Sequence, residues 1–546
     1  MRIWKKGLLA ALAPTLVVGM LTACSGGGKK EPDAAGASVK PSASAAPTAT
    51  PTPSAPVKLR VELWDRSNAA PGKTITDNFL TNWIAEEVKK IGIDIEFVPV
   101  PRAQEEEKLN VWLASGGSPD IIFTYNATIM QRYAEQGGLQ ELGELIDKYG
   151  PNIKEKNKVA LGLAGTYKGK RYAVPARVEA IAGSMMKIRQ DWLDKVGMQV
   201  PTTPDELYAV LKAFKEKDPG GVGKDNVVPW GLAAPSQGMQ AFWFGLGFGF
   251  GINHDGPGGI IYMPFGNYRD GAFTSGWVTP EGKTTFAFMN KAYKEGLIAR
   301  EFATDVNNQK LNEALAKGWV GFIDSNGSAA TTNPVVRKSV PTAKWVNVPP
   351  FKRPDGKQVM PVNQKSGMLV MVPKTSKVPE AAIKYLNWMV QQENITTLLR
   401  GKEGVHYKVE DGLNIPINPD QRKVDLFTAA DVALLYNGSM EYTLAQLKKL
   451  NDTPENPDNG DFLYDQQEMS KKYGVAEKTI DQPRPFAEKN NAIFSKYLYE
   501  AIAKTIMAPD FEKEYGSLVD GWNKLGGQTY DKEVTDALKA MEQTKK

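Results

Sequence analysis

The stretches KLRVELW (58–64) and IDIEFV (93–98) decide the fold class of this chain. The first alternates polar and apolar side chains, as a β-strand with one buried face should. Between the two stretches, apolar residues from Phe79 to Val88 recur at the spacing of one helix face. A strand, a helix and a second strand in this order are typical of α/β units, in which the two strands run parallel.

Strand and helix patterns continue to alternate toward the C-terminus. Thr203-Pro204-Asp205-Glu206 has the form of a capping box with proline at the first helical position. The folded body begins near Val57 and exceeds the ~250–300 residues that one hydrophobic core usually supports, so we expect two lobes. Further strands are expected at 121–123, 320–324, 345–348 and 367–372, and further helices at 492–507 and 511–522.

The first residues have the pattern of an export signal. Three basic residues precede an apolar run, Leu8–Met20, which is shorter than the ~20 apolar residues of a membrane span. Leu21-Thr22-Ala23-Cys24 then resembles the bacterial lipobox, in which a small residue precedes a cysteine that becomes lipidated. We therefore predict a lipoprotein signal peptide over residues 1–23, and attachment to the extracytoplasmic side of the cell membrane through lipid on Cys24 only.

The segment that follows has almost no large apolar side chain and cannot offset the entropy of ordering. We expect residues 24–56 to be the lipidated cysteine and a disordered tether. Since Cys24 is the only cysteine, hydrophobic cores and not disulfides must stabilise the body, and 42% hydrophobic residues are enough for that. Loss of the basic signal lowers the formal charge from +5 to +2, which gives no reason to expect a nucleic-acid partner.

The sequence offers no motif for catalysis. It contains two histidines, and neither HExxH, a Cys/His cluster nor G-x-S-x-G occurs. Gly276–Thr284 imitates a phosphate-binding loop, but it has five residues between its glycines where four are needed. Gly245–Gly251 lacks the spacing of a dinucleotide fingerprint and is interpreted as a flexible or closely packed loop. We expect no catalytic residue and no cofactor. Carboxylates are as plentiful as on any soluble surface, and they give a glycosidase pair no positive support.

Aromatic residues are abundant, with 12 Trp, 19 Tyr and 20 Phe. Aromatic rings stack on the C–H faces of sugars, but they also fill hydrophobic cores. Four tryptophans lie within helical patterns and are assigned to the core: Trp83, Trp112, Trp192 and Trp388. For those at strand ends or in Gly/Pro-rich loops both interpretations stay open: Trp64, Tyr125, Trp230, Trp243, Trp277 and Tyr407.

Several segments, in a fixed order, resemble one family. These segments are ASGGSPDIIFT (114–124), YAEQGGLQELGELIDKYGPNI (133–153), YKGKRYAVPARVE (167–179), IRQDWLDKVGMQVPTTPDELYAVLKAFKEKDP (188–219), YKEGLIAREFAT (293–304), MVPKTSKVPEAAIKYLNWM (371–389) and GKEGVHYKVEDG (401–412). In them the chain is similar to the extracellular solute-binding proteins of bacterial ABC importers, and within that family to a lipoprotein group with oligosaccharide- and alginate-binding members.

The resemblance implies an α/β, two-lobed type II periplasmic-binding-protein fold. Ligand would lie in a cleft between lobes that close about a hinge. The chain would cross between lobes near Val174–Arg177 and Asn363–Gly367. By this analogy, lobe 1 holds 57–174 plus 365–425, lobe 2 holds 178–362, and 426–546 form a helical C-terminal region that packs on both lobes.

The resemblance also implies a monomeric binding protein without catalysis, which captures an oligosaccharide and delivers it to ABC permease subunits. The alternatives are a receptor for peptide or another polar solute on the same fold, and an extracellular polysaccharide-active enzyme. Ligands of open α/β sheets bind beyond the carboxyl ends of strands. The expected ligand-binding residues are Trp64, Asp65, Tyr125, Asn126, Arg177, Glu179, Trp243, Trp277, Asp324, His406 and Tyr407.

One segment departs from the family's pattern. Many relatives carry a calcium loop of the form DPNGNGKxDE, whereas residues 218–227 here read DPGGVGKDNV. Gly220 and Val222 replace oxygen-bearing side chains, and Val227 replaces the carboxylate. Calcium takes ~6–8 oxygen ligands, so we predict that calcium binding is lost or very weak and that the chain holds no metal.

Overall fold

The described residues of the computed structural model belong to one unit of the chain, Ser54–Lys546, which is separate from Met1–Pro53. The predicted signal peptide, Cys24 and nearly all of the tether lie outside the described residues, as does Glu179. The structure describes residues 55–178, 184–233, 243–253, 255, 265–305, 308–326, 329–362, 366–436, 442–476, 480, 482 and 484–544.

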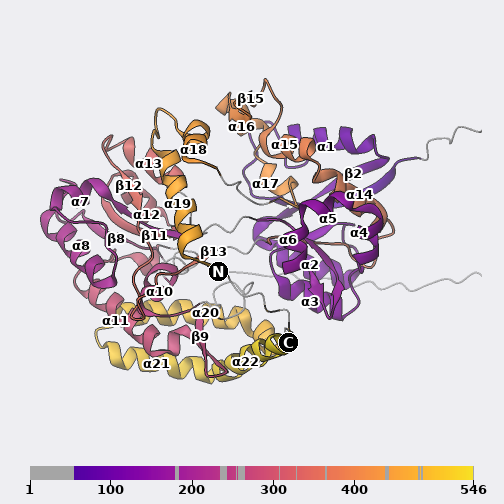
Figure 1. The fold of residues 1–546 in the computed structure, drawn as a ribbon. Helices are drawn as coiled ribbons and strands as arrows, with labels where there is room; N and C mark the ends of the chain where they lie inside the picture. The colour runs from indigo at the N-terminus through magenta and orange to yellow at the C-terminus, as the bar shows by residue number, and fades with distance from the viewer. Residues whose placement is uncertain are drawn as a thin grey trace, which may run out of the picture. The chain divides into compact units, whose positions relative to one another are not determined.

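The strand–helix–strand prediction at the N-terminal end is confirmed (Figure 1). Strand β1 (Val57–Asp65) pairs in parallel with β2 (Ile93–Pro101) along its whole length, and helix α1 (Phe79–Lys89) connects them. Asn78 caps this helix: its side chain accepts hydrogen bonds from two backbone N–H groups, and Thr81 completes the capping box. Both faces of β1 are covered, because Glu62 and Trp64 are buried as well as the alternating apolar residues.

The rest of the first sheet is mixed and not purely parallel. Strand β14 (Leu369–Met371) lies antiparallel between β3 (Ile122–Thr124) and β6 (Ala173–Pro175). A parallel bridge from Val61 to Ile121 joins these strands to β1. The antiparallel direction follows from the path of the chain. It leaves this lobe at the end of β6, and when it returns β14 begins at that same edge of the sheet and runs back along β6.

The first hydrophobic core also contains residues from the start of the C-terminal region. It includes Val432–Leu435, which lie in the segment 426–546 and pack on this lobe. Helix α17 (Ala429–Val432) packs on β1 and α1. The helices of this lobe also include α2 (Glu105–Ser115), α3 (Ala127–Glu135), α4 (Gly143–Tyr149), α5 (Pro151–Lys156), α6 (Lys158–Leu163), α14 (Pro379–Met389) and α15 (Gln392–Arg400).

The second lobe has a four-stranded sheet in the order β12-β7-β11-β8. Strand β11 pairs in parallel with β8, whereas β7 is antiparallel to both of its neighbours. Trp192 fills its core at 5.2 Å from the Phe214 ring, as predicted. The bounds are β7 (Ser184–Arg189), β8 (Val228–Gly231), β11 (Val320–Asn326), β12 (Trp345–Asn347), α7 (Gln190–Val196), α8 (Pro204–Lys217), α11 (Pro280–Lys294), α12 (Gln309–Ala316) and α13 (Ala329–Arg337).

The predicted capping box of α8 forms only in half. The Thr203 hydroxyl accepts a hydrogen bond from the Glu206 backbone N–H, which is the expected cap. The Glu206 carboxylate, however, accepts from the backbone and hydroxyl of Thr202, one residue before the cap. The helix therefore begins where the sequence predicts, with a different partner for the glutamate.

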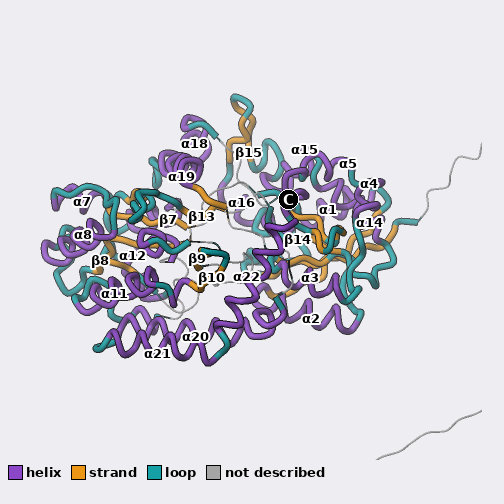
Figure 2. Tube along the Cα trace, turned by 60° about the horizontal axis from the view of Figure 1, so that its bottom comes forward, coloured by secondary structure: helices purple, strands orange, loops and turns teal. Residues whose placement is uncertain are grey.

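The C-terminal helices share the core of the second lobe. Helices α20 (Pro485–Met507) and α21 (Phe511–Lys524) lie side by side and pack on α11 (Figures 1 and 2). Trp522 contributes a ring at 4.9 Å from that of Trp277. Helix α22 (Gly527–Thr544) follows. Helix α19 (Asn459–Tyr473) packs on β12 and α13, and α18 (Leu444–Asn451) packs on α19. A contact with the first lobe runs from Gln131 Nε2 to the Ile480 carbonyl, 3.4 Å.

Candidate functional site

The carboxyl ends of β1, β2 and β3 carry polar and aromatic residues on one edge of the first sheet. Asp65 ends β1, Arg102 directly follows β2, and Tyr125 and Asn126 directly follow β3. Since these strands are parallel, their carboxyl ends meet at the edge where open α/β sheets bind ligands. This group is called the first-lobe edge.

Trp64 lies beneath this edge with 0% of its surface exposed. Its indole ring lies 4.8 Å from the Phe123 ring, and the Arg102 guanidinium covers it at 4.0 Å. The indole N–H donates to Glu62 Oε1 at 2.9 Å. Trp64 therefore has the contacts of a core residue, and no face of its ring is open to a ligand in this structure.

Tyr125 is the exposed aromatic residue of the first-lobe edge. It is 45% exposed, and its ring lies 5.7 Å from that of Trp64. Asn126 beside it caps α3 by accepting from the Thr128 backbone N–H, and its amide donates to Glu106 at 3.1 Å. Asp65 is partly buried, and its carboxylate accepts from the Ser67 backbone N–H at 2.8 Å. Both polar side chains are oriented by the backbone around them.

Buried carboxyl groups support this edge, and sequence reasoning missed them. Glu62 accepts from the indole N–H of Trp64 and from the Phe123 backbone N–H, while burial raises its pKa to about 8. Burial likewise raises the pKa of Glu105 to about 7, opposed by the Arg102 guanidinium 3.1 Å away. The strand alternation gave no signal for Glu62, since it predicts a solvent-facing side chain there.

A second arginine at this edge, Arg66, binds a buried carboxylate. Its Nε lies 2.9 Å from both oxygens of Asp431, a residue of α17 that is 1% exposed. The guanidinium also lies 5.8 Å from the Trp64 ring. The pair links the end of β1 to a helix more than 300 residues later in the sequence, so no local pattern could reveal it.

Three further predicted residues lie near the segments that cross between lobes or in the segment 401–412. The Arg177 guanidinium stacks on the Tyr436 ring at 4.3 Å, and its backbone N–H donates to Leu435. His406 is buried: its Nδ1 accepts from the Lys402 N–H, and its Nε2 lies 3.0 Å from Asp425 Oδ2. His406 thus has a structural role in this loop. Tyr407 is partly buried at the start of β15 (Tyr407–Glu410).

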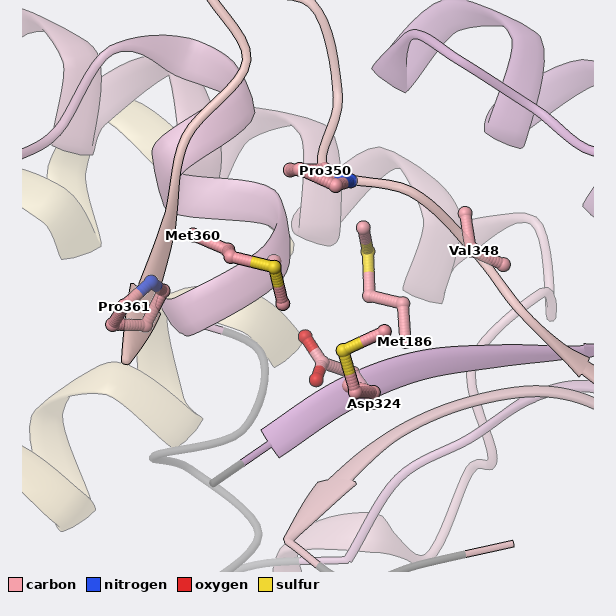
Figure 3. A pocket seen from close by; sticks show the side chains of 8 residues that line it. Met186, Asp324, Val348, Pro350, Met360 and Pro361 are labelled. Carbon is pink, nitrogen blue, oxygen red and sulfur yellow. The ribbon is translucent and has the colours of Figure 1, made fainter. Parts of the chain in front are cut away.

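The second lobe contains a small pocket at the corresponding edge of its sheet (Figure 3). Asp324 lies on the wall of this pocket, near the carboxyl end of β11, and is 5% exposed. Gly245 passes so close that a Cβ there would lie 2.6 Å from Asp324 Oδ2. The other described residues of the lining are apolar: Met185, Met186, Val348, Pro350, Met360 and Pro361.

Two predicted tryptophans of this lobe have different outcomes. Trp277 is 1% exposed within the core, against Trp522, so no face of its ring is open to a ligand. Trp243 begins a short π-helical turn, Trp243–Gly247, and its side chain lies outside the described residues. Trp230, for which both interpretations were open, is buried at 5.6 Å from the Phe322 ring. Lys187 on β7 is buried as well, and burial lowers its pKa to about 8.

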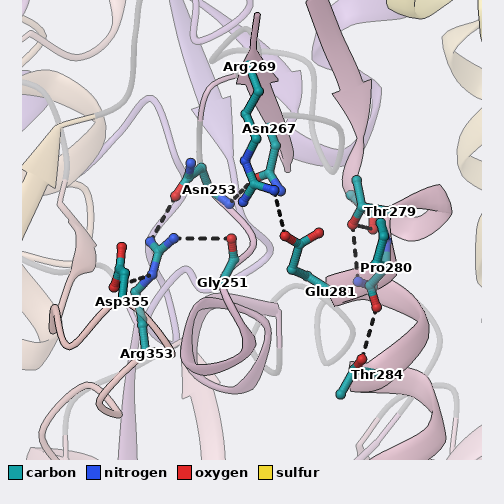
Figure 4. Close-up of polar contacts among 12 residues, drawn as sticks. Gly251, Asn253, Asn267, Arg269, Thr279, Pro280, Glu281, Thr284, Arg353 and Asp355 are labelled. Atoms are coloured by element: carbon teal, nitrogen blue, oxygen red, sulfur yellow. Dashed lines mark hydrogen bonds and ion pairs between the residues drawn. The ribbon is translucent and has the colours of Figure 1, made fainter.

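The two glycine-rich segments have structural explanations. The Gly245–Gly251 run forms helical turns that pack closely, and the Arg353 guanidinium binds the Gly251 carbonyl and the Asn253 side chain after it (Figure 4). In the segment that imitates a phosphate loop, Thr279 caps α11 by accepting from the Gly282 N–H. A Cβ at Gly282 would lie 1.9 Å from the Gly276 carbonyl oxygen, so this glycine allows a close backbone approach.

The residues of the degraded calcium loop do not fit a calcium site. Both Asp218 carboxylate oxygens accept backbone N–H groups, from Val222 at 3.0 Å and Gly223 at 2.8 Å. The Asn226 amide donates to the Val222 carbonyl, and Val227 is buried. The Asp218 carboxylate thus holds the loop closed through these two backbone hydrogen bonds. Loss of calcium binding stays a prediction.

The described residues bear on two further features, metal centres and membrane-spanning helices. Among these residues, no group of three or more His, Cys, Asp or Glu side chains is arranged to hold a metal ion. In the same part of the chain, no helix has both the length and the apolar character needed to cross a bilayer.

Comparison with known proteins identifies relatives over most of the body. The chain is 30% identical to lipoprotein LipO of Bacillus subtilis over 341 residues, which are 60% of this chain and 64% of that protein, just under two thirds of its length. It is 26% identical over 474 residues to the polygalacturonan/rhamnogalacturonan-binding protein YtcQ of the same organism, covering 83% of this chain and 87% of that protein.

Among solved structures, the Streptococcus pneumoniae ABC-transporter substrate-binding protein FusA in complex with kestose has the same fold. Its TM-score is 0.66 at 19% identity, over 90% of this chain and 100% of that chain. This likeness and the two hydrophobic cores confirm the predicted two-lobed α/β fold. The profile of the bacterial extracellular solute-binding protein family matches residues 70–395, more than half of the sequence. The chain therefore belongs to the bacterial extracellular solute-binding proteins.

Proposed function

We propose that this protein captures an oligosaccharide outside the cell and delivers it, unaltered, to the permease subunits of an ABC importer. The observation that carries the proposal is the sequence relation, over most of the chain, to a protein named for binding polygalacturonan and rhamnogalacturonan. A further relative, from Streptococcus pneumoniae, is named as a fructooligosaccharide-binding protein of an ABC transporter.

The geometry of the first-lobe edge supports a sugar ligand. Tyr125 presents an exposed ring that can stack on the C–H face of a sugar. Asp65 and Asn126 beside it are hydrogen-bonding groups that the backbone already orients, so little entropy is lost when a hydroxyl binds. Arg66 and Arg102 add partly exposed guanidinium groups. In the second lobe, Asp324 supplies an acceptor for a hydroxyl.

The geometry gives no support to a glycosidase at the first-lobe edge. Glu62 and Glu105 have the raised pKa of a general acid. However, both oxygens of Glu62 already accept protein N–H groups, and its side chain is 1% exposed. Glu105 is 5% exposed and pairs with Arg102. Neither carboxyl group can reach a glycosidic oxygen without unfolding this edge, so we propose binding without turnover.

Lipid on Cys24 would keep the receptor near its permease, and a monomer is sufficient for this role. The Pro- and Ser-rich segment between Cys24 and the body would allow the body to move while it stays at the membrane. Two signals normally anchor a protein stably, and the diacylglyceryl and amide-linked chains of a bacterial lipoprotein provide more than one acyl chain.

A thermal-shift screen tests the proposed function. A ligand that binds only the folded state raises the melting temperature. At a ligand concentration of one hundred times its Kd, the free energy of unfolding increases by ~2.7 kcal/mol. Purified protein is melted with oligosaccharides from pectic, fructan and alginate sources, and separately with di- to pentapeptides. Stabilisation by at least one oligosaccharide set and by no peptide is expected. Stabilisation by peptides alone would replace this proposal with a peptide receptor.

A further inference from the structure

Arg102 lies at a junction of regular elements in the first-lobe edge. Strand β2 ends at Pro101, a 3-10 turn covers Arg102–Gln104, and α2 begins directly afterward at Glu105. No loop residue separates the three elements, and the ring of Pro101 restricts the backbone just before the arginine. A residue held between a strand and a helix in this way is placed more precisely than a loop residue.

Two buried neighbours orient the Arg102 guanidinium. Its Cζ lies 4.0 Å from the centre of the Trp64 ring, as in a cation–π contact. Its Nη1 lies 3.1 Å from Glu105 Oε1, and Glu105 is 5% exposed. The Arg102 side chain itself remains 35% exposed. The group is therefore oriented before a ligand arrives, and binding costs less side-chain entropy than it would for a mobile arginine.

Part of this guanidinium has no partner in the described part of the chain. Glu105 faces Nη1, whereas Nε and Nη2 of Arg102 make no hydrogen bond to a described residue. Arg66 differs, because its Nε lies 2.9 Å from both Asp431 oxygens and its Nη2 2.8 Å from one of them. The side of the fork that carries Nε and Nη2 is thus occupied in Arg66 and open in Arg102.

The open side of Arg102 has an aromatic neighbour. The Tyr125 ring is centred 6.0 Å from Arg102 Cζ, and Tyr125 is 45% exposed. A sugar unit that packs its C–H face on the exposed part of this ring lies within reach of the arginine N–H groups. A guanidinium donates two parallel hydrogen bonds from a fixed planar fork, so it suits two oxygen atoms that lie side by side.

We propose that Arg102 is a specificity-determining ligand contact, which binds two adjacent oxygens of the sugar unit that packs on Tyr125. The inference rests on the proposed function and names one contact within it. The oxygen pair can be the carboxylate of a uronate or two neighbouring hydroxyl groups, since both accept from the same fork. Trp64 and Glu105 act only through Arg102, by holding its guanidinium.

The test measures affinities for three preparations. They are fragments of a pectic polysaccharide, the same fragments after reduction of their carboxylates to hydroxymethyl groups, and fructooligosaccharides. The proteins are the unchanged chain, Arg102→Met, Arg102→Lys and Arg60→Met. Methionine keeps an apolar stem against Trp64 without N–H donors, and lysine keeps the charge without the fork. Arg60 is a matched control on β1, with a side chain that is 39% exposed and lies 3.5 Å from Glu96.

We expect both Arg102 variants to bind at least one preparation at least tenfold more weakly, and Arg60→Met to change every affinity less than twofold. A loss confined to the unreduced pectic fragments identifies a carboxylate as the oxygen pair, and a loss shared with an uncharged preparation identifies hydroxyl groups.

Unchanged affinity of Arg102→Met would overturn the proposal, and so would full affinity of Arg102→Lys, because charge without the fork would then suffice. If Arg102→Met does not fold, Arg102→Lys still decides, since it keeps a cation beside Trp64. Failure of the unchanged chain to bind any of the three preparations would instead contradict the proposed function.

Discussion

Trp64 and Tyr125 lie 5.7 Å apart, ring to ring, and are expected to respond oppositely to mutation. Replacement of Trp64 by phenylalanine removes the second indole ring and the N–H that donates to Glu62. The lost ring area costs ~1–2 kcal/mol at ~25 cal/mol per Å². A buried Glu62 oxygen without its donor costs a further ~1–3 kcal/mol. We expect Trp64→Phe to lower the free energy of unfolding by ~2–5 kcal/mol.

Tyr125→Ala should leave stability nearly unchanged, because the side chain is 45% exposed. Its loss removes a stacking surface for the ligand and should weaken binding by ~1–2 kcal/mol, or about 5- to 30-fold in Kd. The same oligosaccharide is titrated into each variant at a temperature where all of them are folded.

The assays are urea unfolding, followed by tryptophan fluorescence and circular dichroism, and calorimetric titration. The reasoning predicts a lower urea midpoint with retained affinity for Trp64→Phe, and a retained midpoint with lost affinity for Tyr125→Ala. If Trp64→Phe kept its urea midpoint but lost affinity, the Trp64 ring would have to face the ligand, and its assignment to the core would be wrong.

Three further outcomes are expected. Arg66→Ala should lower the free energy of unfolding in urea by ~2–3 kcal/mol, which is less than for a fully buried pair because Arg66 is partly exposed. Arg66→Lys should recover only part of the lost stability. Equal stability of both variants and the unchanged protein would contradict a stabilising role of the pair with Asp431. Burial raises the pKa of Asp531 to about 6, so the folded state holds the proton of this carboxyl group more tightly than the unfolded state does. Relative to Asp531→Asn, the unchanged protein should therefore lose ~2–3 kcal/mol of stability as pH rises from about 4 to 6. An unchanged protein that became more stable than Asp531→Asn over this pH range would contradict the raised pKa. Cys24→Ser should release the protein from membranes into the medium with ligand affinity retained, as fractionation and titration would show; continued membrane retention would argue against the lipid anchor.

Local patterns predicted the secondary structure well where caps and periodicity agree. Two examples are the pairing of β1 with β2 and the start of α8 at Pro204. In both, the residues that carry the pattern are separated in the sequence by no more than one helix or strand. The predicted helices at 492–507 and 511–522 are α20 and α21, and the first begins earlier, at Pro485.

Burial by distant segments is what local patterns could not predict. The alternation of β1 assigns Trp64 to a strand end and suggests an accessible ring. In the structure Phe123 and the Arg102 guanidinium cover the Trp64 ring, and Glu62 is buried and accepts a hydrogen bond from the Phe123 backbone. Helices α14 and α17, from hundreds of residues later, also pack on β1, and α17 supplies Asp431 for Arg66. Trp277 is covered in the same way, by Trp522 of the C-terminal helices.

The pocket of the second lobe was predicted only in part. Asp324 was identified because it ends a strand pattern, and the Gly245–Gly251 run indicated a closely packed segment. Met186 and Met360 gave no signal, since methionine within an apolar stretch is typical of core packing. The described lining residues come from five separate stretches of the chain, and the register of β7 against β11 brings Met186 to Asp324.

Capture without chemistry is the central claim, and one calorimetric titration with product analysis tests it most directly. The oligosaccharide with the largest thermal shift is titrated into the purified protein, and the sugar is recovered afterward for mass spectrometry. We predict one ligand per chain at saturation and a sugar of unchanged mass after prolonged incubation. Shortened or eliminated products that increase with time, or no heat with any oligosaccharide, would contradict the assignment of this protein as an oligosaccharide receptor.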